Sequence, residues 1–264
     1  MRLADAHCHL LDSAFSADLA EVVERAKRAG VVYMVSSTLS VAEAMRHASM
    51  AGELMEAGVF WSIGLDPRLY SREAEEVEEL ARKFSHSIAA IGEVGLDFKM
   101  ARGVEEREVQ RRVFSDFISL AMELKKPIVV HSRWSQKAVL DLLEEHRADL
   151  VLLHAYTGSS SDVERAAKLG YLISVSTSVT RHAGTRRVAA EAPLECLVLE
   201  SDSPALAPVA GERNEPANIA VAAAEVARIR GVEAAVVSEA AFENTVGLYS
   251  LPMSLLSSSR ALDT

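Results

Sequence analysis

Eight short apolar runs alternate with longer segments of helical spacing along this chain of 264 residues, and this alternation constrains the fold more than any other feature. The runs are rich in valine, isoleucine and leucine and contain few polar residues, which is typical of parallel strands buried on both faces. The pattern therefore predicts an α/β protein built from strand–helix repeats. The expected strands are residues 2–10, 31–37, 59–65, 89–96, 127–132, 150–155, 171–176 and 197–202.

The segments between these strands have the spacing of amphipathic helices. In the first segment Leu19, Val22, Val23 and Ala26 share one face, and Gly30 stands where such a helix would end. Eight repeats within a chain of this length predict a single (β/α)8 TIM barrel, which typically takes about 250 residues. The alternative is an open doubly wound sheet, which usually has fewer strands and often a glycine-rich phosphate loop; the sequence contains no such loop motif.

The C-terminal part of the chain does not continue the strand–helix repeat. Residues 232–249 predict one more helix, packed outside the ring of helices. Residues 253–264 are rich in serine and weakly patterned, as in a frayed or disordered tail. We therefore expect one TIM-barrel domain over residues 1–252 and a C-terminal tail over residues 253–264.

Charge and cysteine content narrow the class of protein. The chain has 38 acidic and 28 basic side chains and a net charge of −10, which argues against coating duplex DNA through a wide basic surface. An enzyme that holds a few phosphates through metal ions and local arginines remains compatible with this charge. The two cysteines lie far apart, the N-terminal residues do not have the pattern of a signal peptide, and no window approaches the ~20 apolar residues of a membrane span. These observations predict a cytoplasmic protein with no membrane partner, and they specify no oligomeric state.

Polar residues gather at the expected carboxyl ends of the strands, which is where TIM barrels build their active sites. Two imidazoles from one short strand share a face when they lie two positions apart, and they form half of a metal site. Carboxylates and further histidines follow at the ends of four other strands. The candidate metal ligands are His7, His9, Glu93, His131, His154 and Asp202.

Each of these residues alone fits an ordinary hydrogen-bonded core residue. Together, six polar groups at one end of a buried barrel need compensation for their lost hydration, and a metal cluster supplies it most simply. Six ligands are too many for one tetrahedral ion, so two divalent ions are expected. His7, His9 and Asp202 would hold one ion and His131 and His154 the other, with Glu93 between them.

The ligand types also limit the metal and suggest roles. Nitrogen and oxygen donors without thiolates suit Zn²⁺ or Mn²⁺. Two such ions can activate water and stabilise both oxygens of a displacement at phosphorus. Glu93 and Asp202 are the candidate catalytic residues, and Asp202 could also accept or deliver the proton.

The remaining histidines and cysteines have simpler explanations. His47, His86 and His146 fall in or at the ends of helical segments and are expected at the surface or at helix caps. His182 follows the seventh strand and suits either a substrate contact or a helix start. Cys8 alternates with its histidine neighbours, so its side chain is expected in the core on the helix side of the strand.

The motifs around the candidate ligands resemble those of the TatD family of metal-dependent deoxyribonucleases, within the amidohydrolase-like TIM barrels. They occur in the family's order and cover nearly the whole chain. The resemblance implies hydrolysis of nucleic-acid phosphodiesters, typically as a 3′→5′ exonuclease, with Mg²⁺ as the usual ion and single-stranded DNA or DNA ends as the substrate. The matching motifs are residues 5–9, 92–97, 131–133, 154–158, 200–204 and 213–216.

One position departs from the family pattern. The family usually has Gly-x-His-Pro after the third strand, whereas this chain has Gly64-Leu-Asp66-Pro67. Aspartate repels a phosphodiester unless it is protonated, pairs with Arg68 or binds a metal. This change keeps open a second activity at the same site, the hydrolysis of a carboxylic ester, amide or lactone. A non-catalytic phosphate-binding scaffold is a third interpretation, and the complete ligand set argues against it.

Several charged residues are candidates for substrate contact. They fall in loops on the expected active face, where cations can reach phosphates despite the negative net charge. The candidate substrate-binding residues are Asp66, Arg68, Arg133 and Arg213, and Lys99, Arg102 and Arg181 fall in the same set of loops.

Overall fold

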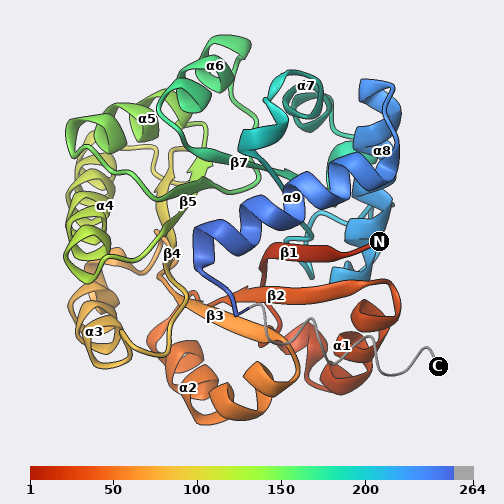
Figure 1. Ribbon diagram of the computed structural model, residues 1–264. Coiled ribbons are helices and arrows are strands. Elements are labelled where there is room, and N and C mark those ends of the chain that lie inside the picture. The colour runs from red at the N-terminus through yellow and green to blue at the C-terminus, as the bar shows by residue number, and fades with distance from the viewer. Residues whose placement is uncertain (253–264) are drawn as a thin grey trace.

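The computed structural model describes residues 1–252 and shows a nearly closed parallel barrel (Figure 1). The strands follow one another around the barrel in sequence order, each parallel to the next. All eight predicted strands and the (β/α)8 TIM-barrel architecture are confirmed. The strands are β1 (Leu3–Cys8), β2 (Val31–Ser37), β3 (Val59–Ile63), β4 (Ala90–Asp97), β5 (Ile128–Arg133), β6 (Val151–Leu153), β7 (Leu172–Ser176) and β8 (Leu197–Glu200).

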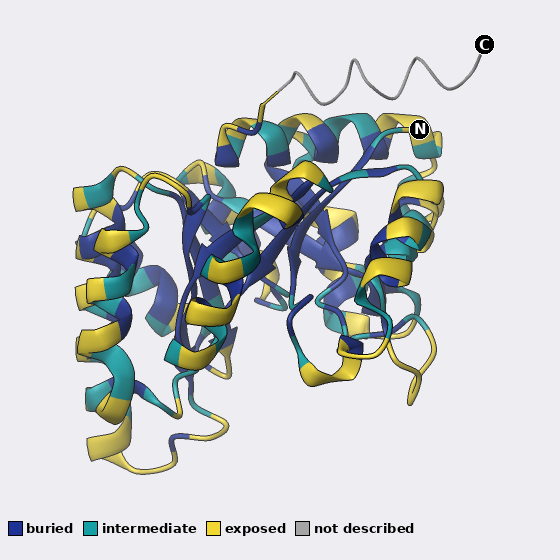
Figure 2. Ribbon diagram, turned by 90° about the horizontal axis from the view of Figure 1, so that it is seen from below, coloured by how far each residue is buried: buried dark blue, intermediate teal, exposed yellow. Residues whose placement is uncertain are grey.

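Helices surround the barrel and bury one face each against it, so the strands lie in a shell of apolar side chains (Figure 2). Short 3-10 helices lie at Ser13–Phe15, Thr177–Thr180, Leu194–Cys196 and Pro216–Asn218. The α-helices are α1 (Leu19–Arg28), α2 (Val41–Glu56), α3 (Tyr70–Lys83), α4 (Val104–Leu124), α5 (Gln136–Glu145), α6 (Ser160–Lys168), α7 (Ala183–Glu191), α8 (Ile219–Arg230) and α9 (Ala234–Tyr249).

The seam between β1 and β8 is held by the segments that follow these strands and by one buried carboxylate. The backbone N–H of Asp202 donates to the carbonyl of His7 at 3.0 Å, and that of His9 donates to Ser203 at 2.8 Å. The side chain of Asp5 accepts from the backbone N–H of Ser201 at 2.8 Å and from its hydroxyl at 2.6 Å. These contacts place the first and last strands side by side at their carboxyl ends.

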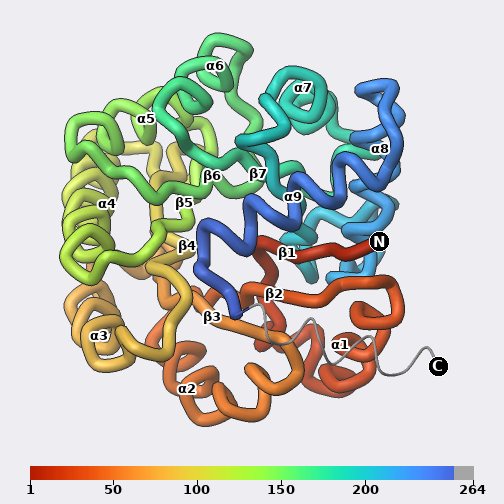
Figure 3. Tube along the Cα trace, viewed as in Figure 1, coloured from red at the N-terminus to blue at the C-terminus, as the bar shows by residue number. Residues whose placement is uncertain are grey.

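Helix α9 lies across the end of the barrel where the strands begin (Figures 1 and 3). Its residues Phe242 and Tyr249 pack against a buried apolar cluster of strand residues that includes Ala4 and Val198. The hydroxyl of Tyr249 donates to the carbonyl of Ala6 at 2.8 Å. The predicted extra helix is therefore confirmed, and its place outside the ring is over the amino-terminal mouth. The mouth at the carboxyl ends of the strands is not covered by this helix.

One prediction about the histidines is wrong. His47 does not lie at the surface: its side chain has no exposed area, and its ring stacks on Trp61 with centroids 5.0 Å apart and planes 9° apart. His47 lies on the face of α2 that packs inward together with Ala44 and Leu54. His86 is exposed and His146 caps the end of α5, as expected. Cys8 is buried, also as expected.

Two further expectations concern membranes and the tail. None of the helices between residues 1 and 252 combines the length and the apolar character needed to cross a bilayer. The predicted tail, residues 253–264, lies outside the described residues.

Candidate metal centre

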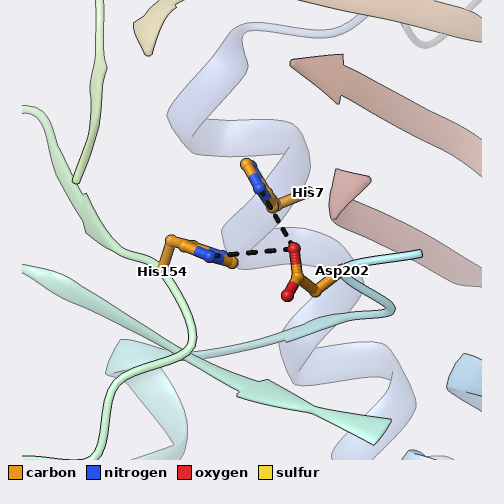
Figure 4. A group of neighbouring side chains, drawn as sticks. All are labelled: His7, His154 and Asp202. Atoms are coloured by element: carbon orange, nitrogen blue, oxygen red, sulfur yellow. Dashed lines mark ion pairs between the residues drawn. The ribbon is translucent and has the colours of Figure 1, made fainter. Parts of the chain in front are cut away.

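The carboxyl ends of five strands bring all six predicted ligands together. His7 lies within β1 and His9 directly after it, while Glu93 and His131 lie within β4 and β5. His154 follows β6, and Asp202 comes two residues after β8. Figure 4 shows His7 and His154, from separate parts of the chain, both turned toward Asp202. The parallel order of the strands therefore assembles the predicted cluster on one mouth of the barrel.

The carboxylate of Glu93 stands between two pairs of imidazoles. Its Oε2 lies 3.3 Å from Nε2 of His7 and 3.4 Å from Nε2 of His9. Its Oε1 lies 2.6 Å from Nδ1 of His131 and 3.5 Å from Nε2 of His154. Each oxygen of one carboxylate thus faces a different pair of nitrogens.

Asp202 closes the cluster from the side of β8. Its Oδ1 lies 3.6, 3.4 and 3.8 Å from Nε2 of His7, His9 and His154. Three overlapping groups of ligands have all their donor atoms within 4.8 Å of one another: His7 with His154 and Asp202, His7 with His9 and Glu93, and Glu93 with His131 and His154. Convergent nitrogen and oxygen donors of this kind fit divalent transition metals.

Burial and close contact shift the pKa values across this cluster. Burial alone would raise the pKa of Glu93, but the charge on His154 and hydrogen bonds from His131 and the β1 histidines bring it well below its usual value. Burial likewise opposes the charge on His131, yet Asp97 and Glu93 raise its pKa to about 9. The pKa of His154 rises to about 10, because Glu200, Glu93 and Asp202 outweigh its burial. The carboxylates therefore attract positive charge to this mouth, and a metal ion would displace these imidazole protons on binding.

Close backbone contacts explain two glycines of the motifs. Gly95 has φ +151°, and a Cβ there would lie 2.1 Å from the carbonyl oxygen of His131. A Cβ on Gly64 would lie 2.3 Å from the backbone nitrogen of Glu93. A larger residue at Gly95 would push β4 away from β5, and one at Gly64 would push the end of β3 away from Glu93.

Sequence reasoning did not identify the residues that support the ligands. Glu200 accepts from Nδ1 of His154 at 3.1 Å and from the backbone N–H of Ala155 at 2.8 Å. Asp97 lies 3.4 Å from Nε2 of His131. Both acids stand within the motifs that carry the ligands, so their polarity in apolar strands was the available signal. Hydrogen bonds of this type fix the ring orientation of a metal-binding histidine and raise its basicity.

The last residue of β2, Ser37, orients the rings of His7 and His9. The hydroxyl of Ser37 lies 3.0 Å from Nδ1 of His7, and the Ser37 carbonyl accepts from Nδ1 of His9 at 3.2 Å. Nε2 of both rings is left facing the carboxylates. The polar end of an otherwise apolar strand was the only sequence signal for Ser37.

The candidate substrate-binding residues have different environments. Arg133 lines a cavity of about 470 Å³ together with His131, His154 and Asp202. His182 lines the same cavity and also caps α7, accepting from the backbone N–H of Thr185. The predicted helix-start role of His182 is thus confirmed.

Asp66, Arg68 and Arg213 are not among the residues that line this cavity. Asp66 accepts from the backbone N–H of Arg68 at 2.8 Å and from its guanidinium Nε at 2.9 Å. Arg68 lines a separate, smaller cavity. Arg213 donates to both carboxylate oxygens of Asp18 at 2.7 Å.

The fold and the site together define a metal-dependent hydrolase of the TIM-barrel class. A sequence model described as TatD related DNase matches residues 4–250. The chain therefore belongs to the TatD family, and the resemblance seen in its motifs is confirmed.

Individual relatives agree with this assignment over nearly the full length. The chain is 34% identical to human deoxyribonuclease TATDN3 over 94% of both chains. It is 33% identical to the uncharacterized metal-dependent hydrolase MJ1582 of Methanocaldococcus jannaschii, covering 93% of this chain and 96% of that one. Among solved structures, the TatD homolog YJJV of Escherichia coli matches with a TM-score of 0.86 and 27% identity, covering 95% of this chain and 99% of that one.

Proposed function

We propose that this protein is a deoxyribonuclease that hydrolyses phosphodiester bonds of DNA at a two-metal centre. The observation that carries the proposal is the position of Glu93, whose two oxygens face separate pairs of imidazoles. One ion alone would leave half of these donors without a function. The nuclease named among the relatives, human TATDN3, supports DNA as the substrate class.

The proposed ligand sets follow the two sides of Glu93. His7, His9 and Asp202 would hold one ion, and His131 and His154 would hold the other, with Glu93 available to both. Two divalent ions supply Lewis-acid activation of water and of the phosphate when bound. The family resemblance favours Mg²⁺, while the imidazole-rich donor set suits Zn²⁺ or Mn²⁺ equally well.

The chain's own groups would bind and orient the substrate and move the proton. Asp202 lies at the edge of the cavity, where its carboxylate can accept a proton from the attacking water. Glu93 contacts both pairs of histidines and so fixes their positions relative to each other. Arg133 is exposed in the same cavity and supplies a cation for a phosphate oxygen.

Asp66 need not oppose this chemistry. Its carboxylate is paired with the guanidinium of Arg68, so the repulsion of an incoming phosphodiester is reduced. Arg68 remains 66% exposed and can add a cation at this side of the mouth. Arg213 would contact a phosphate only after leaving Asp18. Of the four candidate substrate-binding residues, Arg133 therefore lies in the cavity, and Asp66 and Arg68 pair with each other. Arg213 is held by Asp18.

The proposed substrate form and location rest on the family resemblance and on the cysteines. We propose single-stranded DNA or DNA ends as substrate, with 3′→5′ polarity. A reducing cytoplasm agrees with two buried cysteines that are both free.

The test is cleavage of 3′-labelled single-stranded DNA by protein reconstituted with Mg²⁺, Mn²⁺ or Zn²⁺, beside a panel of carboxylic esters and lactones. We expect release of the labelled 3′-terminal nucleotide in the first cleavage and no turnover of the panel. Glu93→Gln should lose both bound metal and cleavage, whereas Met122→Ala, an exposed change on α4, should keep both. Absence of DNA cleavage with every metal, or full activity of Glu93→Gln, would overturn the proposal.

A further inference from the structure

Trp134 is an exposed aromatic residue held in an unusual backbone conformation beside the candidate metal centre. It follows β5 directly, has φ +58° and is 71% exposed. Bulky residues rarely adopt this left-handed conformation, and residues that do so gather at functional sites. The adjacent Ser135 hydroxyl donates to the carbonyl of Leu96 at 2.7 Å, which anchors the turn to β4. The chain thus projects a large aromatic ring into solvent from a fixed support.

The ring belongs to the same cavity as the metal ligands. Trp134 lines this cavity of about 470 Å³ together with His131, His154 and Asp202. That volume lies within the range of sites that bind nucleotide-sized molecules. A group held against Trp134 is therefore in the cavity where the proposed reaction takes place.

One cation lies over the ring of Trp134, and two more line the same cavity. The ammonium of Lys99 lies 5.9 Å from the Trp134 ring centroid, and Arg133 and Arg181 line the same cavity. The side chains of Lys99 and Arg133 are both exposed to solvent. A largely exposed aromatic ring together with exposed cations in one cavity is the combination that binds single-stranded nucleic acid, in which bases stack and phosphates contact positive charge.

We propose that Trp134 is the stacking platform for a nucleobase of the DNA nucleotide next to the scissile bond, with Lys99 and Arg133 contacting its phosphates. This inference rests on the proposed nuclease function and adds a base-binding subsite to it. Stacking makes the subsite tolerant of base identity, because every base offers an aromatic face. The enzyme should therefore discriminate strongly between a terminal nucleotide and an abasic end, and weakly among the four bases.

The first experiment measures binding without turnover. Trp61, the other tryptophan, is 3% exposed and stacked on His47, so changes in acrylamide quenching report mainly on Trp134. Metal-loaded protein is titrated with deoxyadenosine 5′-monophosphate and, in parallel, with 2-deoxyribose 5-phosphate. We expect the nucleotide to shield Trp134 from acrylamide and to bind more tightly than the sugar phosphate. Equal affinity for the two ligands, or an unshielded Trp134, would overturn the proposal.

The second experiment measures cleavage. Trp134→Ala should lower kcat/KM on single-stranded DNA about 5- to 150-fold, the loss expected on removing one stacked base, and should change cleavage of an abasic 3′ end little. Trp134→Phe should retain most of the activity, and Met122→Ala should match wild type. Equal losses on normal and abasic ends would contradict stacking.

The two experiments separate the subsite from the nuclease proposal. Shielding of Trp134 by the nucleotide in a protein that cleaves no DNA would refute the nuclease function and keep a nucleotide site. DNA cleavage by wild type that is unchanged in Trp134→Ala would keep the nuclease and refute the subsite.

Discussion

The buried pair of His47 and Trp61 should make the stability of this protein sensitive to pH in a way that one substitution removes. Burial lowers the pKa of His47 from its ordinary value of 6.5 to about 4. A contact with its own backbone favours the charged imidazole, but burial outweighs it, and neither ring nitrogen has a hydrogen bond of good geometry within residues 1–252. The folded protein therefore keeps this imidazole neutral, whereas the unfolded chain protonates it near pH 6.5.

The direction in which the free energy of unfolding changes with pH follows from proton binding at His47. Between the two pKa values the unfolded state binds more protons at His47, so the free energy of unfolding falls as the pH drops below about 6.5 and levels off near 4. One pKa unit corresponds to about 1.4 kcal/mol, so the full effect is about 3 kcal/mol and about 2 kcal/mol is lost by pH 5. Above pH 7 the residue contributes no pH dependence.

The perturbation is His47→Phe, which keeps a planar ring against Trp61 and removes the titrating group. Urea unfolding of wild type and variant at pH 7.5 and 5.0, with the same metal content, isolates His47 because the site histidines contribute equally to both proteins. Wild type should lose about 2 kcal/mol more than His47→Phe over this interval. His86→Gln, which removes an exposed imidazole, is the control and should follow wild type. Parallel pH curves for wild type and His47→Phe would refute the reasoning.

Three further predictions concern the site and the barrel ends. Glu200→Gln should weaken metal binding about 10- to 100-fold, measured by competition with a chelating dye, because His154 loses its anionic acceptor; unchanged affinity would exclude this role. Asp66→His should raise the rate of phosphodiester cleavage, because it removes a negative charge that pairing with Arg68 reduces but does not abolish; an equal rate would show that this charge does not slow the enzyme. Tyr249→Phe should cost about 1–2 kcal/mol in urea unfolding, since the buried carbonyl of Ala6 loses its donor; a cost near zero would mean that the helix end relaxes freely.

The barrel and its ligands could be predicted because both leave a local signal. Strands buried on two faces give uninterrupted apolar runs, and a charged residue inside such a run is conspicuous, as Glu93 is in β4. The surface position predicted for His47 is wrong because it follows the polarity of the side chain and not its position in the helical repeat of α2. The buried residues Ala44, His47 and Leu54 follow the helical period, so the spacing placed His47 on the inward face.

Other features depend on partners that are distant in sequence. Arg213 meets Asp18 across 195 positions, and no local pattern links the two residues. Helix α9 is apolar over much of its circumference, so its sequence specifies burial without specifying which end of the barrel it covers. The sequence alone did not indicate that Glu200 and Asp97 orient metal ligands. Each of the two acids contacts a histidine that belongs to another strand, so the contacts are visible only in the folded structure.

The position of α9 has a consequence for the order of events on the ribosome. A nascent chain that has reached β7 presents β1 with one open edge and leaves the apolar interior around Ala4 and Val129 uncovered. Strand β8 and the cover supplied by Phe242 and Tyr249 emerge only near the end of synthesis. Asp202, needed beside His7 for the metal cluster, emerges equally late. Exposed edges and apolar surface make such intermediates prone to aggregation, so the nascent barrel is most at risk between the synthesis of β1 and the release of α9.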